Sequence, residues 1–298
     1  MVLAFPIQSL SAGLSDLITI EQVGDNNNAF VRDINTTTTD PTTYNTFVLQ
    51  DGDDNVAYIE QVGENIFTKV QQFGNDNKVR INVVDGVTPP STFTASTFPF
   101  DGDLNSRDIF QNGNLNVANL TQIGDLNEAF VTQIGVENKA VVSQVAAPLI
   151  ANSNETTIEQ TGNENFASVT QGVEGAPCDN CTATITQTGN RNGEPTFPAG
   201  SILTTIFQAG TDNTATINQS GDGNNAAIAQ GTEFTPCEDC IATITQNGDG
   251  NGAVDPITGI PGTSIFQAGT SNTATITQTG NGNLAEISQG AASNCQNC

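Results

Sequence analysis

Cysteine is the residue type in this sequence that could take part in the widest range of reactions, and the six cysteines occur in three Cys-x-x-Cys pairs. This spacing suits a local disulfide, a redox pair or one half of a zinc site. Local disulfides formed in an oxidising compartment are the first prediction, and metal binding by the same thiols, within one chain or between chains, stays open beside it. A redox enzyme is disfavoured, because no βαβ pattern surrounds the pairs. The candidate disulfides, whose cysteines are also the possible metal ligands, are Cys178–Cys181, Cys237–Cys240 and Cys295–Cys298.

Two acidic turns could offer oxygen ligands to calcium. Residues 51–55 and 101–105 both read Asp-Gly-Asp-x-Asn, which places oxygen-bearing side chains at alternating positions. Neither segment continues into a complete EF-hand loop. Calcium binding is therefore kept open beside a simpler interpretation, in which these acidic turns are solvated and keep the strands soluble.

The composition argues against an enzyme and against several classes of partner. The 298 residues include no histidine, the commonest general base and metal ligand, and we find no nucleophile motif, phosphate-binding loop or carboxylate pair. The net charge of −25 would repel nucleic acid and anionic membranes. No apolar run approaches the roughly 18–20 residues of a membrane span. We therefore expect no catalysis, no resident cofactor, no nucleic acid partner and no membrane insertion.

The elements that would carry these residues follow an eleven-residue repeat. Gln122 and Gln133 are each followed by glycine after two positions, asparagine after five and alanine after seven, and Gln144 continues the series. About twenty such units fit along the chain. A strict repeat indicates that every unit has the same neighbours before and after it.

Each unit is predicted to be one short strand and one turn. Alternate residues from Asn213 to Gln219 fall on one face, which is the period of a strand, and residues 220–224 read Ser-Gly-Asp-Gly-Asn, a turn composition. Such a strand cannot bury its inner face alone, so two units form a coil with two strands facing each other. The predicted fold class is all-β: a two-sheet parallel β-solenoid of about ten 22-residue coils, about 4.8 Å apart, with edge loop insertions.

Small and β-branched residues are expected to fill the narrow interior, with glutamine and asparagine at the corners. There each amide can hydrogen-bond to the identical residue one coil away, as in stacked amyloid sheets. Their fixed spacing distinguishes these amides from those of a low-complexity tract. The residues predicted to form structural ladders are Gln111, Gln122, Gln133, Gln144, Gln208, Gln219, Gln230, Gln267, Gln278, Gln289, Asn116, Asn127, Asn138, Asn213 and Asn272.

Insertions into the repeat sort onto two edges of the expected coil. Those on one edge follow even-numbered strands and comprise residues 36–46, 85–107 and 146–152 and the loops with the first two cysteine pairs. Those on the opposite edge follow odd-numbered strands and comprise residues 193–203 and 252–262. No insertion interrupts a strand, as expected of loops in a real solenoid.

The repeat resembles the curlin repeat, the unit of curli functional amyloid in bacterial biofilms. Residues 111–122 and 208–219 both match Gln-x-Gly-x-x-Asn-x-Ala-x-x-x-Gln, and the resemblance extends from about residue 20 to residue 289. It implies a curli-like major fibre subunit, secreted unfolded to the extracellular space or cell surface, that polymerises with copies of itself. A nucleator subunit and a dedicated secretion channel are the further partners implied. The chain departs from curlins in its length, its edge loops and its Cys-x-x-Cys pairs, and in the last respect it is similar to a second family of biofilm amyloid subunits.

We divide the chain into three parts. These are residues 1–17, a cap or a segment concerned with secretion; residues 18–290, the solenoid; and residues 291–298, a tail with the third cysteine pair. Because the motif continues to Gln289, the last coil is expected to leave its strand edges unpaired. This favours head-to-tail assembly into fibres.

The alternative function is a monomeric solenoid that binds ice, calcium or another surface ligand. Outward Thr-x-Thr pairs are expected to stack on one sheet as a flat array, which resembles the arrays of ice-binding solenoids. The simpler interpretation is the strand propensity of threonine on an exposed face. The pairs are Thr184/Thr186, Thr214/Thr216, Thr243/Thr245 and Thr275/Thr277.

Overall fold

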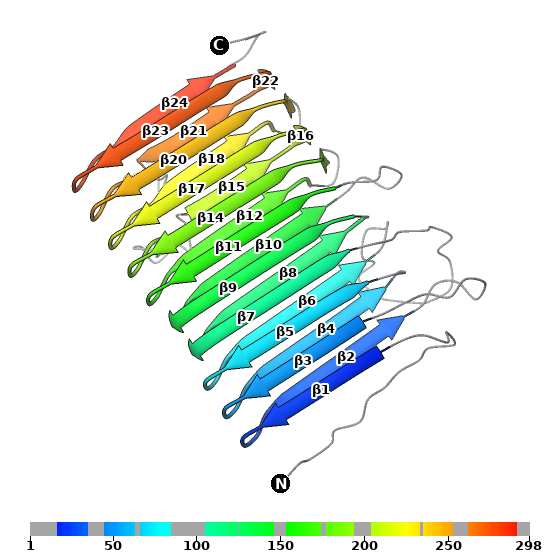
Figure 1. Cartoon of the computed structure of the whole chain (residues 1–298). Coiled ribbons are helices and arrows are strands. Elements are labelled where there is room, and N and C mark those ends of the chain that lie inside the picture. The colour runs from blue at the N-terminus through cyan, green and yellow to red at the C-terminus, as the bar shows by residue number, and fades with distance from the viewer. Residues whose placement is uncertain are drawn as a thin grey trace.

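The computed structural model of the chain shows a stack of β-coils in which β1 and β24 lie at opposite ends (Figure 1). No helix occurs among the residues described, and so none there could cross a membrane. The structure describes residues 17–34, 45–62, 66–84, 105–124, 126–145, 153–173, 177–193, 204–232, 235–252 and 262–290.

Two ten-stranded parallel sheets form the walls of the stack. The first sheet contains β1 (Leu17–Val23), β3 (Asn45–Asp51), β5 (Phe67–Phe73), β7 (Ser106–Asn114), β9 (Glu128–Val136), β11 (Glu155–Thr161), β14 (Thr182–Thr188), β17 (Thr214–Ser220), β20 (Ile241–Asn247) and β23 (Thr273–Thr279). The second contains β2 (Asn28–Ile34), β4 (Val56–Val62), β6 (Lys78–Val84), β8 (Val117–Ile123), β10 (Lys139–Val145), β12 (Phe166–Gln171), β15 (Thr204–Gln208), β18 (Ala226–Gln230), β21 (Thr263–Gln267) and β24 (Ala285–Gln289). The predicted two-sheet parallel solenoid of ten coils is confirmed.

The strands pair so that equivalent motif positions face each other. Gln111 pairs with Gln133, and Ala118 with Ala140, across neighbouring coils of their sheets. Because side chains alternate along a strand, this register also keeps every inward residue inward. The long connections that leave the second sheet follow β2, β6, β10, β12 and β18, and those that leave the first follow β14 and β20, as the insertion pattern predicts.

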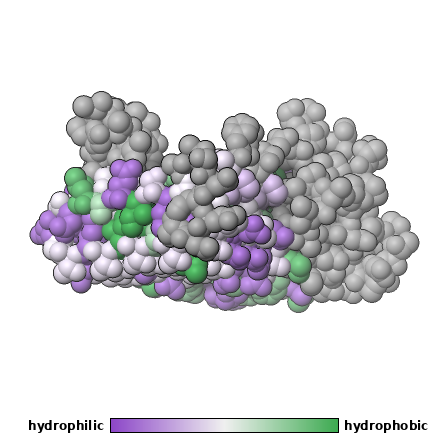
Figure 2. All heavy atoms as spheres, turned by 90° about the horizontal axis from the view of Figure 1, so that it is seen from above, coloured by the Kyte–Doolittle hydropathy of each residue, from purple (hydrophilic) through white to green (hydrophobic). Residues whose placement is uncertain are grey.

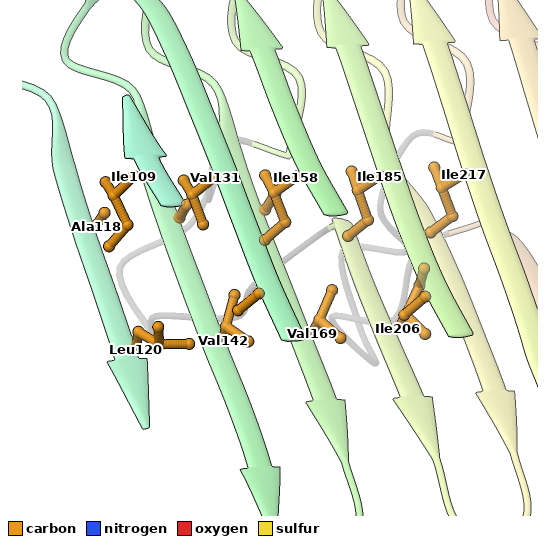
Figure 3. Packing of buried hydrophobic residues seen from close by; sticks show 14 of the residues in the cluster. Ile109, Ala118, Leu120, Val131, Val142, Ile158, Val169, Ile185, Ile206 and Ile217 are labelled. Atoms are coloured by element: carbon orange, nitrogen blue, oxygen red, sulfur yellow. The ribbon is translucent and has the colours of Figure 1, made fainter. Parts of the chain in front are cut away.

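The core is a thin double row of small and branched side chains between the two sheets. Alanines and isoleucines in it, such as Ala129 and Ile158, have no exposed surface. Figure 3 shows the facing rows, with Ile109, Val131, Ile158, Ile185 and Ile217 from the first sheet and Leu120, Val142, Val169 and Ile206 from the second. Small and branched residues fill most of this narrow space at close packing, which agrees with the absence of tryptophan and the single methionine.

Glycine is required where successive turns stack backbone on backbone. Gly135 has a φ of 123°, and a Cβ placed on it would lie 1.9 Å from the carbonyl oxygen of Gly162 in the next coil. Two positions later, Glu137 takes the left-handed conformation with a φ of 60°. The Gly-x-x-Asn segment is therefore a fixed turn whose shape lets one coil lie directly on the next.

A third, narrow sheet runs along one edge and was not anticipated from the sequence. It consists of two-residue strands, β13 (Cys178–Asp179), β16 (Gly210–Thr211), β19 (Cys237–Glu238) and β22 (Gly269–Thr270). We call it the edge sheet. It forms because Cys-x-x-Cys and Gly-x-x-Asn turns of equal length alternate there from coil to coil. At the N-terminal side β1 begins at Leu17, one residue before the sequence-based start of the solenoid at residue 18; residues 1–16 and 291–298 lie outside the described residues.

Candidate functional site: the side-chain ladders and the ends of the solenoid

A continuous column of glutamines runs the length of the first sheet. In each step the Nε2 of one glutamine donates to the Oε1 of the glutamine in the following coil, at 2.6–3.0 Å. Each bond has the same direction, so the column has a donor end and an acceptor end. Its members are Gln22, Gln50, Gln72, Gln111, Gln133, Gln160, Gln187, Gln219, Gln246 and Gln278.

A second glutamine column follows the second sheet from its fourth coil onward. Its Nε2–Oε1 distances are 2.7–3.1 Å. The amides also join the two sheets, because Gln133 Nε2 donates to the Val117 carbonyl oxygen at 3.1 Å. The members of the column are Gln122, Gln144, Gln171, Gln208, Gln230, Gln267 and Gln289.

Arg107 is a buried residue that the sequence analysis missed. It pairs in register with Ala129, so its guanidinium lies where other coils place a small inward side chain, and it has no exposed surface. Its Nε donates to Gln122 Oε1 and its Nη1 to Thr68 Oγ1, the latter at 3.1 Å. The signal available in the sequence was an arginine at an inward position of the repeat. In other coils the Nε2 of the preceding glutamine donates to the glutamine Oε1, and at Gln122 the Arg107 guanidinium takes the place of that donor.

Asparagines form a column along one edge of the solenoid. The Oδ1 of each accepts the main-chain N–H of its counterpart in the following coil, at 2.9–3.1 Å. The Nδ2 group reaches a turn carbonyl, as in the 2.8 Å bond from Asn138 to Gly162. The column consists of Asn27, Asn55, Asn77, Asn116, Asn138, Asn165, Asn192, Asn224, Asn251 and Asn283.

On the opposite edge, Cys181 and Cys240 take the place of asparagine in two coils of the C-terminal half. Asn154 Oδ1 accepts the Cys181 N–H, and Asn213 Oδ1 accepts the Cys240 N–H, both at 3.0 Å. The sequence carried this signal, since Cys181 and Cys240 each precede an inward alanine by two positions, as asparagine does elsewhere. The order along this edge is Asn105, Asn127, Asn154, Cys181, Asn213, Cys240 and Asn272.

The structure pairs Cys178 with Cys181 and Cys237 with Cys240 as disulfides, each with a Cα–Cα distance of 5.9 Å. All four cysteines are completely buried. Each disulfide closes the turn that asparagine closes by hydrogen bonds in the neighbouring coil, where Asn213 Nδ2 reaches the carbonyls of Ala209 and Cys237. The third pair, Cys295 and Cys298, lies outside the described residues, so its pairing stays a prediction.

Side chains of the first acidic turn accept hydrogen bonds from neighbouring coils. Asp53 Oδ1 accepts the Asp25 N–H at 2.7 Å, and Asn55 Oδ1 accepts the Asn77 N–H at 3.0 Å. Among the residues that the structure describes, no three histidine, cysteine or acidic side chains gather as metal ligands would. Residues 101–104 of the second acidic turn are outside the described part. Calcium binding at the turns remains untested.

The outer faces of the sheets differ in chemistry along the molecule. On the second sheet, the Tyr58 ring stacks on Phe30 at 4.9 Å and lies 5.9 Å from the Arg80 guanidinium carbon. Burial, and next the negative charge of Glu60, raise the pKa of Tyr58 above its ordinary value. Figure 2 shows hydrophobic residues in small groups among hydrophilic ones, seen from above relative to Figure 1.

The first sheet, by contrast, has an uncharged threonine face in its C-terminal half. The strands β14, β17, β20 and β23 contain no charged residue. Thr184, Thr216, Thr243 and Thr275 stand opposite one another in successive coils. The second column is interrupted, because Thr186 and Thr245 both pair with Asn218, while Thr214 stands opposite Thr182 and Ile241. The prediction of a regular Thr-x-Thr array is therefore wrong in part, and one threonine column is continuous.

Both ends of the stack leave core residues incompletely covered. Ile18 and Ile20 in β1 and Ile287 in β24 are only half-buried, although they pack against the core, whereas Ile158 in the middle has no exposed surface. Gln278 belongs to the last strand of the first sheet, and its Nε2 is buried without a hydrogen-bond partner. Asn272 Oδ1 on the edge is likewise buried and without a partner. Unpartnered buried amide atoms also occur away from the ends, among them Nδ2 and Oδ1 of Asn127.

The curlin associated repeat family matches the chain in four segments. The first two overlap, at residues 102–135 and 114–145, and the other two are residues 203–232 and 262–290. Each segment contains glutamine positions of the columns described above. No curated protein matches the chain.

Proposed function

We propose that this chain, whose repeats match the curlin associated repeat family in four segments, is a structural subunit that polymerises head to tail into an extracellular, curli-like amyloid fibre. The observation that carries the proposal is the polarity of the first glutamine column. Gln278 Nε2 is a buried donor without an acceptor at one end, and Gln22 presents the first Oε1 at the other. A second copy placed on the last coil would satisfy this donor as every internal coil does.

The same register would complete the core at the joint between two subunits. Pairing β23 with β1 of the next copy places Gln278 on Gln22 and Ile276 on Ile20. The half-buried Ile287 of β24 would then lie near the next copy's second strand. A parallel pair of this length also satisfies main-chain groups that a free strand edge leaves to water.

The net charge of the chain favours growth at the ends over sideways association. The acidic turns repeat along both edges, so neighbouring fibres repel each other. Disulfides of the kind seen at Cys178–Cys181 persist in oxidising compartments, which supports a location outside the cell or at its surface. The role is structural rather than enzymatic, in a biofilm or surface matrix, with a nucleator subunit and a secretion channel as proposed partners.

Two variants that each block one end test this proposal. Ile20→Lys would place a charge on the N-terminal end, and Ile287→Lys would place one on the C-terminal end. We expect that neither variant elongates alone, because burying an unpaired charge at the joint is strongly unfavourable. Mixed in equal amounts they should form dimers and stop, since one intact end of each kind remains.

Negative-stain electron microscopy and analytical ultracentrifugation would provide the measurement. Thr19→Lys, an outward substitution on the same strand as Ile20, is the matched control and should form fibres like the unmodified chain. Fibres from both blocked variants at the normal rate would rule out this joint.

A second candidate function is binding of ordered water at an ice surface by the threonine face. The single in-register column that begins at Thr184 and the absence of charged residues on β14, β17, β20 and β23 favour it. We expect thermal hysteresis that is lost in Thr216→Lys and kept in Thr170→Lys, which lies on the other sheet. A freezing point equal to the melting point in the unmodified chain would reject this function.

A further inference from the structure

We propose that the outer face of β6, β8, β10 and β12 binds a linear acidic polysaccharide, whose carboxylates pair with Lys78, Arg80 and Lys139. We call this surface the basic face. It belongs to one sheet of a single chain, so the proposal does not depend on fibre formation.

The basic face is positively charged in a chain that is otherwise strongly acidic. The chain has 7 lysines and arginines against 32 acidic residues. Three of the seven, Lys78, Arg80 and Lys139, lie in β6 and β10, and the four strands of the face contain no aspartate or glutamate. An anionic ligand would therefore meet only cations and neutral groups along these strands.

The same three cations are free to pair with a ligand. Within the part of the chain that the structure describes, none of them has a carboxylate partner. Arg80 and Lys139 instead lie 5.9 and 5.0 Å from the ring centroids of Tyr58 and Phe166. Lys78, Arg80 and Lys139 are all exposed. Other basic residues are engaged in ion pairs, namely Arg32–Glu60, Lys69–Asp108 and Arg191–Glu164.

The register of the sheet places two of these cations in one line along the stack. Lys78 and Lys139 both pair with Val117 of the intervening strand, so they occupy the same position two coils apart, a separation of about 9.6 Å. Arg80 follows Lys78 by two positions in β6 and therefore points to the same side of the sheet. Cations spaced in this way suit several anionic groups of one extended polymer better than a single small anion.

The turns at one border of the basic face favour a thin ligand. Asp76 and Glu137 lie in the turns that precede β6 and β10, whereas residues 113–116, before β8, contain no carboxylate. Charges elsewhere on the chain are largely screened beyond about 8 Å at physiological ionic strength. A single polysaccharide chain can follow the middle of the strands and stay away from the two turn carboxylates.

Nucleic acid fits the basic face less well, for two reasons. Duplex DNA carries one negative charge per about 1.7 Å of its axis, so most of its phosphates would find no cation at this spacing. Base stacking needs a free ring face, and both faces of Tyr58 are covered, by Phe30 at 4.9 Å between centroids and by Arg80. Acidic polysaccharides carry fewer charges per unit length, because one or two sugar rings separate neighbouring carboxylates.

The test is isothermal titration calorimetry of an oligogalacturonate with the Ile287→Lys chain. This substitution lies in the last coil, away from the basic face, and it blocks growth in the proposed fibre. We expect binding that weakens as salt is added. Lys78→Gln with Lys139→Gln should weaken it about fivefold, because two charge contacts are lost, whereas Lys78→Arg with Lys139→Arg should retain it.

Lys69→Gln with Arg191→Gln is the matched control, since it removes the same charge from ion pairs outside the basic face. It should leave the affinity unchanged, and circular dichroism should show that every variant is folded. Absence of binding to the parent chain, equal weakening in the control, or equal binding of the methyl-esterified oligosaccharide would overturn the proposal. Tighter binding of duplex DNA at the same salt would overturn it in favour of a nucleic acid partner. Fibre growth is measured separately, so its failure would leave this result unaffected.

Discussion

Glutamine suits a stacked column because its amide carries a donor and an acceptor at one end of the side chain. Gln133 accepts from Gln111 and donates to Gln160, each at 2.8 Å, and it is completely buried. An alanine would leave both neighbours unpaired, and a glutamate would provide no donor when it is ionised. At the residue scale, the ladders are therefore specified by chemistry as well as by size.

Gln133→Ala should lower the free energy of unfolding by about 2–4 kcal/mol, because it leaves buried polar groups without partners. Thr132→Ala changes the outward neighbour on the same strand and should alter it by no more than about 0.5 kcal/mol. Denaturant unfolding followed by circular dichroism in the Ile20→Lys background measures both. Equal effects of the two substitutions would contradict the importance of the column.

The cysteine turns should be interchangeable with their asparagine counterparts. Cys178→Ser with Cys181→Ser removes a disulfide that closes a four-residue loop, which should cost about 2 kcal/mol of unfolding free energy. Cys178→Gly with Cys181→Asn installs the turn of the neighbouring coil and should recover most of that loss. Thermal unfolding with and without reductant is the measurement, and a Gly/Asn variant no more stable than the Ser/Ser variant would count against equivalence.

At the scale of the element, the close approach of the next turn determines which residue types a turn position can accept. Gly135 and Gly223 both have positive φ, at 123° and 67°, but only Gly135 would bring a Cβ against a backbone oxygen, that of Gly162. Nothing lies within 4 Å of a Cβ on Gly223. The glycine of Gly-x-x-Asn is thus required by stacking, in addition to its backbone angles.

Gly135→Ala should therefore destabilise the fold more than Gly223→Ala does. The strained φ costs each alanine about 1–2 kcal/mol, and the clash at Gly135 should add about 1–3 kcal/mol. Unfolding midpoints of the two variants, compared at the same denaturant and temperature, test the difference. Similar midpoints would mean that the coils can separate locally at little cost.

At the scale of the whole molecule, every internal coil pairs in register with the coil before it and the coil after it. The internal coils bury the same atoms on both sides, whereas Ile18, Ile20 and Ile287 at the ends are only half-buried. Gln278 Nε2, the last donor of the first glutamine column, is buried at the C-terminal end without a partner. The paired blocking variants of β1 and β24 test assembly at this scale, because they separate end-to-end growth from any sideways association.

The sequence alone determined the coil. The fixed spacing of Gln122, Gln133 and Gln144, with alternation along each strand, is local information, and it specified the strand period, the inward faces and the edges that receive insertions. The tertiary structure decided what depends on contact between coils far apart in sequence. Arg107 beside Gln122, Cys181 in an asparagine column, the edge sheet and the single direction of the glutamine bonds all arise only when coils stack in register. The physical reason is that the motif determines which side chain a coil places at each position. The residue that this side chain contacts is determined by the neighbouring coil in the stack.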